Sequence, residues 1–236
     1  MRVTFLAHDG FLIELNTVCL LFDWWKEPIP PLPDKPLLVF ISHRHEDHFN
    51  PEVFTLAERK ADIQFLLGSD FHLLSRNLEK WRLTPEAAAK CRRCGKHDTF
   101  APLPGVTVET FPSTDEGVAW MVTVEGQSIF HAGDLNWWHW AEEDAGNRNM
   151  EANFKRYTEP LRGRRVDLAM LPLDSRLKTG GYLGPNYFLN LMEVRRFLPM
   201  HQWEDFAFTD EFLSAYPQFA PITVKIHRDG EFLGEL

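Results

Sequence analysis

The sequence predicts a fold of the α/β or α+β class, because segments with the features of strands alternate with segments that have the features of helices. Short apolar runs bounded by Gly, Pro or Asp have the length and the β-branched or aromatic content of strands. They cover residues 2–7, 11–15, 18–22, 37–41, 63–67, 106–111, 119–124, 128–131, 166–171, 197–200 and 222–226. Segments with helix-start residues and helical spacing cover residues 51–60, 70–81, 85–92, 149–161, 185–197 and 210–216.

The length and composition predict one domain with a packed core. The chain has 236 residues, of which 44% are hydrophobic and 25% are charged, close to an average globular protein. We therefore expect a single domain over residues 1–236. The proline-rich stretch 28–36 is interpreted as a stiff loop, since proline removes amide donors and fixes φ. The polar stretch 139–165 is interpreted as an excursion over one edge of the domain.

The charge balance argues against several classes of partner. The chain has 25 Lys and Arg against 34 Asp and Glu, a net charge of −9, so nucleic acid is not expected as a ligand. No apolar run approaches the ~20 residues of a membrane span. Three cysteines, and an N-terminal stretch interrupted by His8 and Asp9, indicate neither a disulfide framework nor a secretory signal. We expect a cytoplasmic protein, and its oligomeric state is not predicted.

A dense set of metal-ligand residues follows the apolar run 37–41. His43, His45, Asp47 and His48 lie within six positions. An uninterrupted apolar run is typical of a strand buried on both faces, and such strands carry functional groups just beyond their carboxyl ends. Imidazole and carboxylate groups suit a borderline cation such as Zn²⁺. The motif therefore predicts a metal site at the end of this strand.

The same arrangement recurs later in the chain. Asp134 follows the run 128–131 in a Gly-Asp pair, and His201 follows the run 197–200 directly. Two further runs are followed by acidic residues, Asp115 and Asp174. Several strands thus deliver His or Asp at their ends, and one site can gather them.

These motifs together resemble the metallo-β-lactamase-fold hydrolases. The resemblance extends to residues 5–14 and 21–23, which are similar to the opening hairpin of the branch that contains the ascorbate-phosphate lactonases. It covers most of the chain, with 70–104 and 139–165 the least matched parts. It implies a four-layer αββα sandwich, in which two β-sheets pack face to face with helices outside, and a metal site at one edge.

The resemblance also implies roles for the ligands. His43 and His45 would bind a first metal ion, Asp47 and His48 a second, Asp134 would bridge the two, and His201 would complete the second site.

The first site departs from the family pattern. The family usually places a third histidine after the strand that corresponds to 106–111, where this chain has Pro112 to Gly117 without one. Asp115 is our substitute ligand, with Ser113, a water or an empty position as alternatives. A carboxylate makes the site harder and more anionic, so Mn²⁺ or Fe²⁺ competes better with Zn²⁺. We expect one or two ions.

The expected activity is that of a metal-dependent hydrolase acting on a small molecule. A metal-bound hydroxide would attack an ester, lactone, amide or phosphodiester, and Asp47 would orient the water or take its proton. Two alternatives stay open: a phosphodiesterase or nuclease, and a non-catalytic metal- or ligand-binding protein with a degenerate first site.

Further residues are expected around the metal ions. His8 and Asp23 would align ligand imidazoles or serve a plain structural role. Trp137 belongs to a set of tryptophans near the ligands that would line a substrate pocket or shield the metal. Asp174 and Arg176 end another run, where Arg176 would bind an anionic substrate group or brace the loop by pairing with Asp174.

Overall fold

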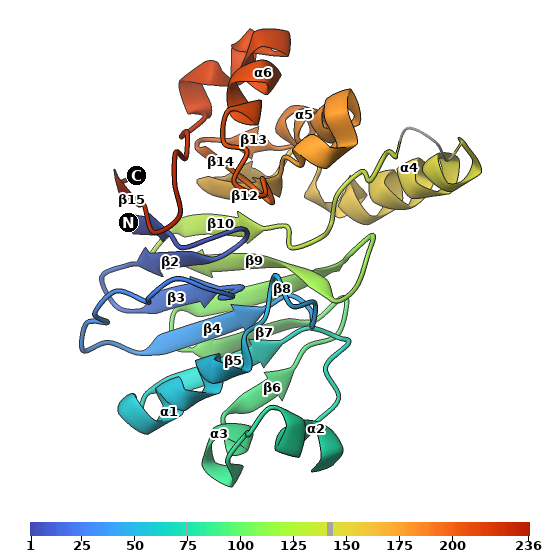
Figure 1. Cartoon of the computed structure of the whole chain (residues 1–236). Coiled ribbons are helices and arrows are strands. Elements are labelled where there is room, and N and C mark those ends of the chain that lie inside the picture. The colour runs from blue at the N-terminus through green and yellow to red at the C-terminus, as the bar shows by residue number, and fades with distance from the viewer. Residues whose placement is uncertain (74, 141–143) are drawn as a thin grey trace.

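The chain folds into two β-sheets that pack face to face between two groups of helices (Figure 1). The computed structural model describes residues 1–73, 75–140 and 144–236. Contacts across the sheet interface are aromatic: the ring centroids of Phe40 and Trp120 are 5.3 Å apart, and the Phe22 ring stacks on that of His131 at 5.0 Å. The predicted class and the four-layer arrangement are confirmed.

The first sheet has seven strands. Its order is β15-β1-β2-β3-β4-β5-β6, and β3 to β6 run parallel. The bounds are β1 Arg2–Phe5, β2 Phe11–Glu14, β3 Cys19–Phe22, β4 Leu37–Ile41, β5 Ile63–Leu67, β6 Cys91–Arg93 and β15 Phe232–Glu235.

The second sheet has six strands in the order β14-β12-β10-β9-β8-β7, and a two-stranded sheet pairs β11 with β13. Strands β10, β12 and β14 run parallel. The bounds are β7 Thr99–Leu103, β8 Val106–Pro112, β9 Val118–Val124, β10 Gln127–His131, β11 Arg165–Val166, β12 Leu168–Pro172, β13 Glu193–Val194 and β14 Phe197–Met200.

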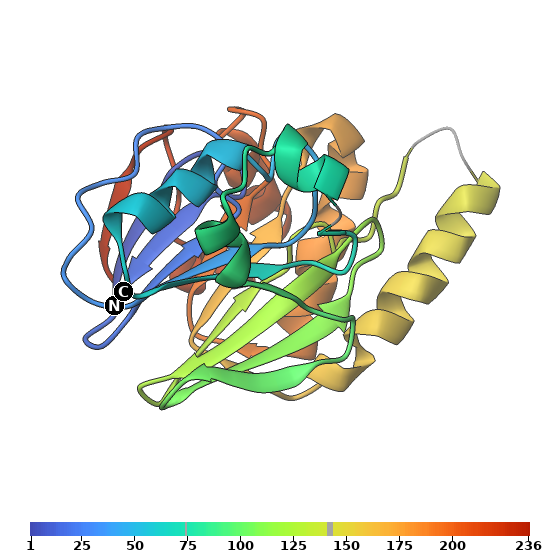
Figure 2. The same ribbon diagram turned by 90° about the horizontal axis from the view of Figure 1, so that it is seen from below.

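Helices cover the outer face of each sheet (Figures 1 and 2). The first group packs on the seven-stranded sheet and comprises η1 Pro51–Thr55, α1 Leu56–Arg59, α2 Ser75–Lys80 and α3 Pro85–Ala89. The second group packs on the six-stranded sheet and comprises α4 Asp144–Thr158, η2 Glu159–Leu161, η3 Ser175–Tyr182, α5 Leu183–Leu191, α6 Phe208–Ala215 and η4 Pro217–Ile222.

The apolar side chains divide into two cores, as the layered arrangement requires. The outer core places Phe54 of η1 against Phe65 of β5, at 5.1 Å between ring centroids, and Trp81 against Phe71 at 5.3 Å. The larger core fills the space between the sheets and continues under the second helical group, where Phe154 of α4 contacts Phe188 of α5 at 5.1 Å between centroids. Both faces of β4 are buried, which explains its uninterrupted apolar sequence.

Several boundaries differ from the sequence prediction. The predicted strand at 222–226 is wrong: the 3₁₀ helix η4 runs to Ile222, and Thr223 makes only an isolated bridge. Most of the polar stretch 139–165 forms helix α4, whose Phe154 is buried, and positions 141–143 lie outside the described residues. The helix predicted over 70–81 is described only over Ser75–Lys80, with residue 74 outside the described part.

The edge strands β6, β7 and β15 were not predicted, because their residues are largely polar or exposed. Strand β15 pairs with β1, which brings the two termini side by side (Figure 1). Among the described residues, no helix combines the length and the hydrophobicity needed to cross a bilayer.

Three glycines pack around Ser42, the first residue after β4. A Cβ built on Gly68 or Gly117 would lie 1.8 or 1.9 Å from the Ser42 carbonyl oxygen, and one on Gly133 would lie 2.7 Å from the Ser42 Cβ. Gly117 also adopts a φ of +71°, a region that disfavours side chains. The segment after β4 is therefore clamped by the ends of neighbouring strands.

Replacing Gly117 with Ala should lower the free energy of unfolding by at least about 3 kcal/mol, because backbone strain adds to a clash with Ser42. Gly126→Ala is the matched control: its φ is +74°, but nothing lies within 4 Å of the added Cβ. It should lose only about 1 kcal/mol. Urea denaturation of both variants measures the difference, and equal losses would contradict the clamp.

Candidate metal centre

Strands of both sheets that run in the same direction end at one edge, and the residues after them converge there. Asp134, three residues beyond β10, lies at the middle. Its Oδ2 is 3.3 Å from His43 Nε2, while its Oδ1 is 3.3 Å from His48 Nε2 and 3.5 Å from His201 Nε2. All four side chains are buried. Three imidazoles thus point their Nε2 atoms at one carboxylate.

Carboxylates on the side away from Asp134 fix which ring nitrogen carries the proton in two of these imidazoles. His48 Nδ1 is 2.9 Å from Asp23 Oδ2, and His201 Nδ1 is 3.0 Å from Asp174 Oδ2. A carboxylate accepts hydrogen bonds, so each Nδ1 carries a proton that it donates. The neutral imidazole then offers the Nε2 lone pair to the site. This is the arrangement that metal-binding histidines adopt.

Asp23 also organises the segment that follows β4. Its Oδ1 accepts the Ser42 amide at 2.7 Å, and its Oδ2 accepts the Ser42 hydroxyl at 2.5 Å. That hydroxyl lies 2.9 Å from His43 Nδ1. It accepts a hydrogen bond from the Nδ1–H group while its own hydrogen is donated to Asp23. One buried carboxylate therefore orients both His43 and His48. The sequence analysis left two roles open for Asp23, alignment of ligand imidazoles and a plain structural role, and in the structure its carboxylate contacts both Ser42 and His48.

The geometry fits a metal ion at this position. Within the described part of the chain, the buried atoms His48 Nε2 and Asp134 Oδ1 have no hydrogen-bond partner. Ligand atoms of His43, His48 and Asp134 lie within 4.8 Å of one another. Buried polar atoms without a partner are costly, and a divalent cation is the partner that imidazole and carboxylate share.

A more exposed group lies beside the buried one. His45 Nδ1 is 2.9 Å from His43 Nε2 and 4.0 Å from Asp115 Oδ2, and ligand atoms of His45, Asp115 and Asp134 lie within 4.8 Å of one another. The Ser113 hydroxyl accepts the Asp115 amide, which ties it into the turn. Asp115, the substitute ligand that the sequence predicts, therefore lies beside His45 and Asp134.

Asp47 faces His8. Asp47 Oδ2 is 3.4 Å from His8 Nε2, and Asp47 is not in any of the convergent ligand groups formed by the described residues. Burial lowers the pKa of His8 to about 3, so this imidazole is neutral. Burial raises the pKa of Asp47, but His8 and His48 outweigh it and hold that pKa below its ordinary value. Asp47 is thus an ionised carboxylate that lies beside a neutral imidazole.

The buried charges at the centre are strongly coupled. Burial alone would lower the pKa of His48, yet Asp134 and Asp9 raise it well above its ordinary value. Burial would raise the pKa of Asp134, but His48 and His201 hold it well below the usual range. The same carboxylates that favour protonated imidazoles attract a divalent cation.

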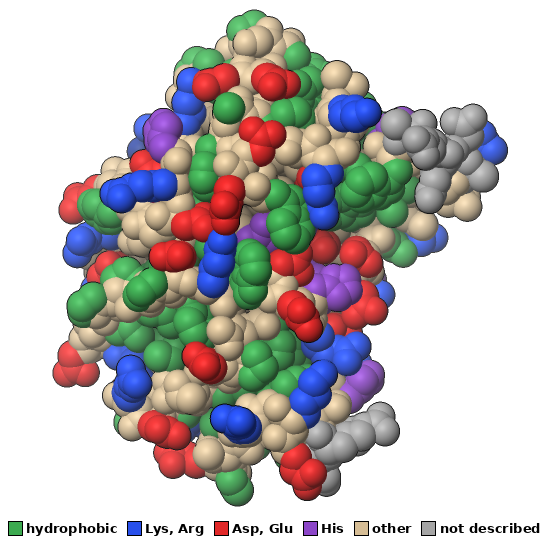
Figure 3. Space-filling view, viewed as in Figure 1, with side chains coloured by type: hydrophobic (Ala, Val, Ile, Leu, Met, Phe, Trp, Pro, Cys, Tyr) green, Lys and Arg blue, Asp and Glu red, His purple; other side chains and the backbone are tan. Residues whose placement is uncertain are grey.

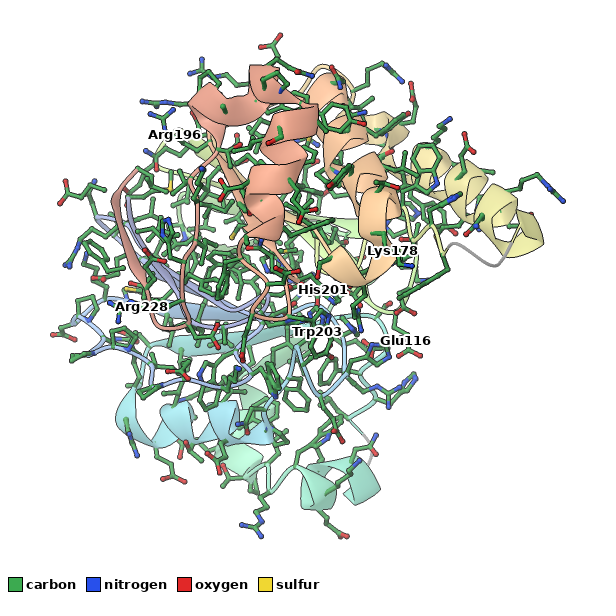
Figure 4. The ribbon with its side chains drawn as sticks, turned by 45° about the horizontal axis from the view of Figure 1, so that its top comes forward. Glu116, Lys178, Arg196, His201, Trp203 and Arg228 are labelled. Carbon is green, nitrogen blue, oxygen red and sulfur yellow. The ribbon has the colours of Figure 1, made fainter. Side chains whose placement is uncertain are left out.

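A cavity of about 350 Å³ opens onto the centre. In the space-filling view, histidine side chains lie beside acidic and hydrophobic ones on this face (Figure 3), and Figure 4 shows His201 and Trp203 close together in the middle of the molecule. The cavity is lined by His45, Asp47, Thr114, Asp115, Asp134, Trp138, Trp140, Met150, Arg176, His201 and Trp203.

The members of the predicted tryptophan set differ in position. Trp137 is not among the residues that line this cavity; its ring lies 6.0 Å from that of Phe154, and Lys155 covers it at 4.8 Å. Trp138, Trp140 and Trp203 of the same set line the cavity.

Arg176 forms the predicted ion pair. Its Nε and Nη2 atoms both donate to Asp174, the carboxylate that also supports His201.

Two buried residues near the centre were not assigned a role from the sequence. Asp9 is fully buried, and its Oδ2 lies 3.6 Å from His48 Nδ1; burial raises its pKa to about 7. Both ring nitrogens of His131 form hydrogen bonds with the backbone: Nε2 donates to the Asp9 carbonyl, and Nδ1 accepts a hydrogen bond from the Gly133 amide. An acidic residue in an apolar hairpin was the one available signal for Asp9.

Comparison with known proteins identifies the family. Residues 2–145, more than half of the chain, match the family model of the beta-lactamase superfamily domain. The chain belongs to the beta-lactamase superfamily. The matched region contains every proposed ligand except His201.

Curated relatives and solved structures agree with the superfamily assignment. A protein named UPF0173 metal-dependent hydrolase from Opitutus terrae is 28% identical over 213 residues, covering 85% of this chain and 84% of that protein. A protein of the same name from Desulforamulus reducens is 24% identical over 99% of both chains. Igni18, a metallo hydrolase from Ignicoccus hospitalis, has the same fold, with a TM-score of 0.65 at 17% identity over 98% of this chain and 96% of that one. The predicted superfamily and the enzyme class, a metal-dependent hydrolase, are confirmed.

Asp174→Ala should weaken metal binding by about 10- to 100-fold, because His201 loses the acceptor that fixes its Nδ1 proton. Competition with a chromophoric chelator measures the affinity. Asp210→Ala is the control, since Asp210 is exposed and forms an ion pair with Lys225. If both variants bind metal as tightly as the unmodified protein, Asp174 does not support the centre.

Proposed function

We propose that this protein hydrolyses a small-molecule substrate at a centre of one or two divalent metal ions. The observation that carries the proposal is the convergence of three Nε2 atoms on the two oxygens of Asp134. This arrangement lies at the floor of an open cavity, so a small molecule has access to it.

The chain offers two overlapping sets of ligands. His43, His45 and Asp115, with Asp134 between the sets, would hold a first ion. His48 and His201, again with Asp134, would hold a second. Asp47 would join the second set after its carboxylate turns from His8. Zn²⁺ suits the imidazoles, and the carboxylate of Asp115 improves the fit for Mn²⁺ or Fe²⁺.

A divalent ion held there acidifies a bound water and polarises a carbonyl or phosphoryl oxygen. The chain's own groups would do the positioning. Asp47, ionised and half-buried at the cavity wall, would orient the attacking water and take its proton. The bond cleaved would be that of an ester, lactone, amide or phosphodiester.

The charge of the cavity favours this function over a nuclease. Among the described residues that line the cavity, Arg176 is the one Lys or Arg, and its guanidinium already pairs with Asp174. A polyanion needs a row of cations to follow its phosphates. A phosphodiester in a small molecule stays compatible with the site.

Asp47→Asn should reduce turnover by at least about 100-fold while leaving the fold intact, because the amide cannot take a proton from water. The assay uses chelator-treated protein reconstituted with Zn²⁺, Mn²⁺ or Fe²⁺ on a panel of esters, lactones, amides and phosphodiesters, with circular dichroism as the folding check. Glu46→Gln, an exposed neighbour in the same segment, is the control. Undiminished turnover in Asp47→Asn would overturn the role of Asp47, and no turnover by the unmodified protein with any metal would favour a binding protein.

Asp115→Ala should lower the metal content of the purified protein from about two ions per chain to about one. The remaining ion stays in the buried set, which does not include Asp115. Elemental analysis of both proteins, purified without added metal, gives the ratio. One ion in each protein would show that Asp115 is not a ligand.

A further inference from the structure

The cavity has a second wall that the proposed metal ligands do not use. Besides its acidic residues, the cavity is lined by Trp140, Arg176 and Trp203, which we call the tryptophan–arginine surface. A substrate that reaches Asp134 through this cavity must pass or contact that surface. Its chemistry therefore bears on which substrates the enzyme accepts.

The guanidinium of Arg176 lies close to two aromatic rings. Its guanidinium carbon is 4.4 Å from the centre of the Trp203 ring and 5.9 Å from that of Trp140. Stacking on aromatic faces restricts the planar group to one orientation. The Asp174 pair restricts it further, because Nε and Nη2 are both donated to that carboxylate.

The outer edge of the Arg176 guanidinium is left for a ligand. In the described part of the chain, Nη1 donates to no acceptor, and 45% of the side chain is exposed. A guanidinium has five donors, and two fork edges can bind two carboxylate-like groups at once. Asp174 occupies one edge, and an anionic group of a substrate matches the other.

Trp140 and Trp203 are each 40% exposed. Among the described residues, Phe232 is the one other large hydrophobic side chain that is exposed. Trp203 is also held in an unfavourable backbone conformation, with φ +50°, and its ring contacts that of His8 at 4.5 Å. Exposed, positioned indoles beside a catalytic centre offer flat apolar surfaces on which a ring can stack. Strain of this kind concentrates at functional sites.

We propose that the tryptophan–arginine surface is a specificity subsite that selects substrates with an aromatic ring bearing an anionic group. The ring packs against the indoles while the anion binds the outer edge of Arg176, which leaves the scissile bond on the side of Asp134. This assignment rests on the proposed hydrolase function for its meaning, but the binding preference itself does not require turnover.

Isothermal titration calorimetry on the zinc-reconstituted protein tests the preference with three probes. Naphthalene-2-sulfonate carries both features, methyl 2-naphthyl sulfone keeps the ring without the charge, and cyclohexanesulfonate keeps the charge without the aromatic ring. Sulfonates are chosen because they are weak metal ligands. Naphthalene-2-sulfonate should bind at least about tenfold more tightly than either of the other two, a difference of about 1.4 kcal/mol.

Variants separate the two contributions. Arg176→Gln should remove the preference for the sulfonate over the sulfone, and Trp140→Leu should remove the preference for naphthalene over cyclohexane. Arg162→Gln makes the same change at an exposed ion pair with Glu159 and should alter none of the three affinities. All titrations are run at saturating zinc, with zinc content checked by elemental analysis.

The outcomes are distinguishable. If Arg176 serves only to brace Asp174, Arg176→Gln will weaken zinc binding while the three probes keep their original affinity ratios at saturating zinc, which overturns the subsite. Equal affinities of the three probes for the unmodified protein overturn it as well. Selective binding without hydrolysis on the substrate panel would instead overturn the hydrolase function and leave the subsite standing.

Discussion

The buried carboxylate of Asp23 joins three segments that are distant in the sequence. It follows β3, accepts two hydrogen bonds from Ser42 after β4, and accepts a third from His48. A buried charge is costly unless hydrogen bonds replace its hydration, and here three donors do so. The bond to His48 orients that imidazole directly, and the bonds to Ser42 orient His43 through the Ser42 hydroxyl. Both imidazoles in turn face the carboxylate of Asp134. The metal centre thus depends on an interaction that lies behind it.

Backbone strain marks the same region. His8, Asp23, His201 and Trp203 all adopt positive φ values, between +38° and +61°. Each such residue costs about 1 kcal/mol or more, which the rest of the fold must offset. Asp23 and His201 are the first residues after β3 and β14. A sharp turn there directs the side chain into the centre instead of continuing the strand. Packing in the two hydrophobic cores offsets the free-energy cost of this strain.

The sequence predicted the parts of the centre that follow buried strands. Strand β4 is apolar throughout because both its faces are covered, and its ligands come directly after it. Asp9 was missed because its burial against His48 depends on packing between segments, which no local pattern reveals. Trp137 and Trp140 are three positions apart in an irregular segment, where no strand or helix period tells which side chain faces the cavity. Edge strands such as β6 lack a buried face, so their alternation is weak.

The two proposed ligand sets differ in solvent exposure, and this difference affects how tightly each set would hold an ion. The side chains of His45 and Asp115 are 46% and 47% exposed, whereas His48 and His201 are buried and each is held by a further carboxylate. Water screens the charges of the first set, so an ion there would be held less tightly and would exchange more readily. The buried set would retain its ion and fix Asp134 between the two.

The exposed set also lies on the cavity side, where Arg176 and the indoles approach. In the proposed centre, a substrate would therefore meet the exposed position first, where the sequence predicts Asp115 as a ligand. A carboxylate there would neutralise more of an ion's charge than an imidazole, which would lower the acidity of a bound water. The exposed position would thus set the strength of the nucleophile, and the buried position would set the stability of the centre.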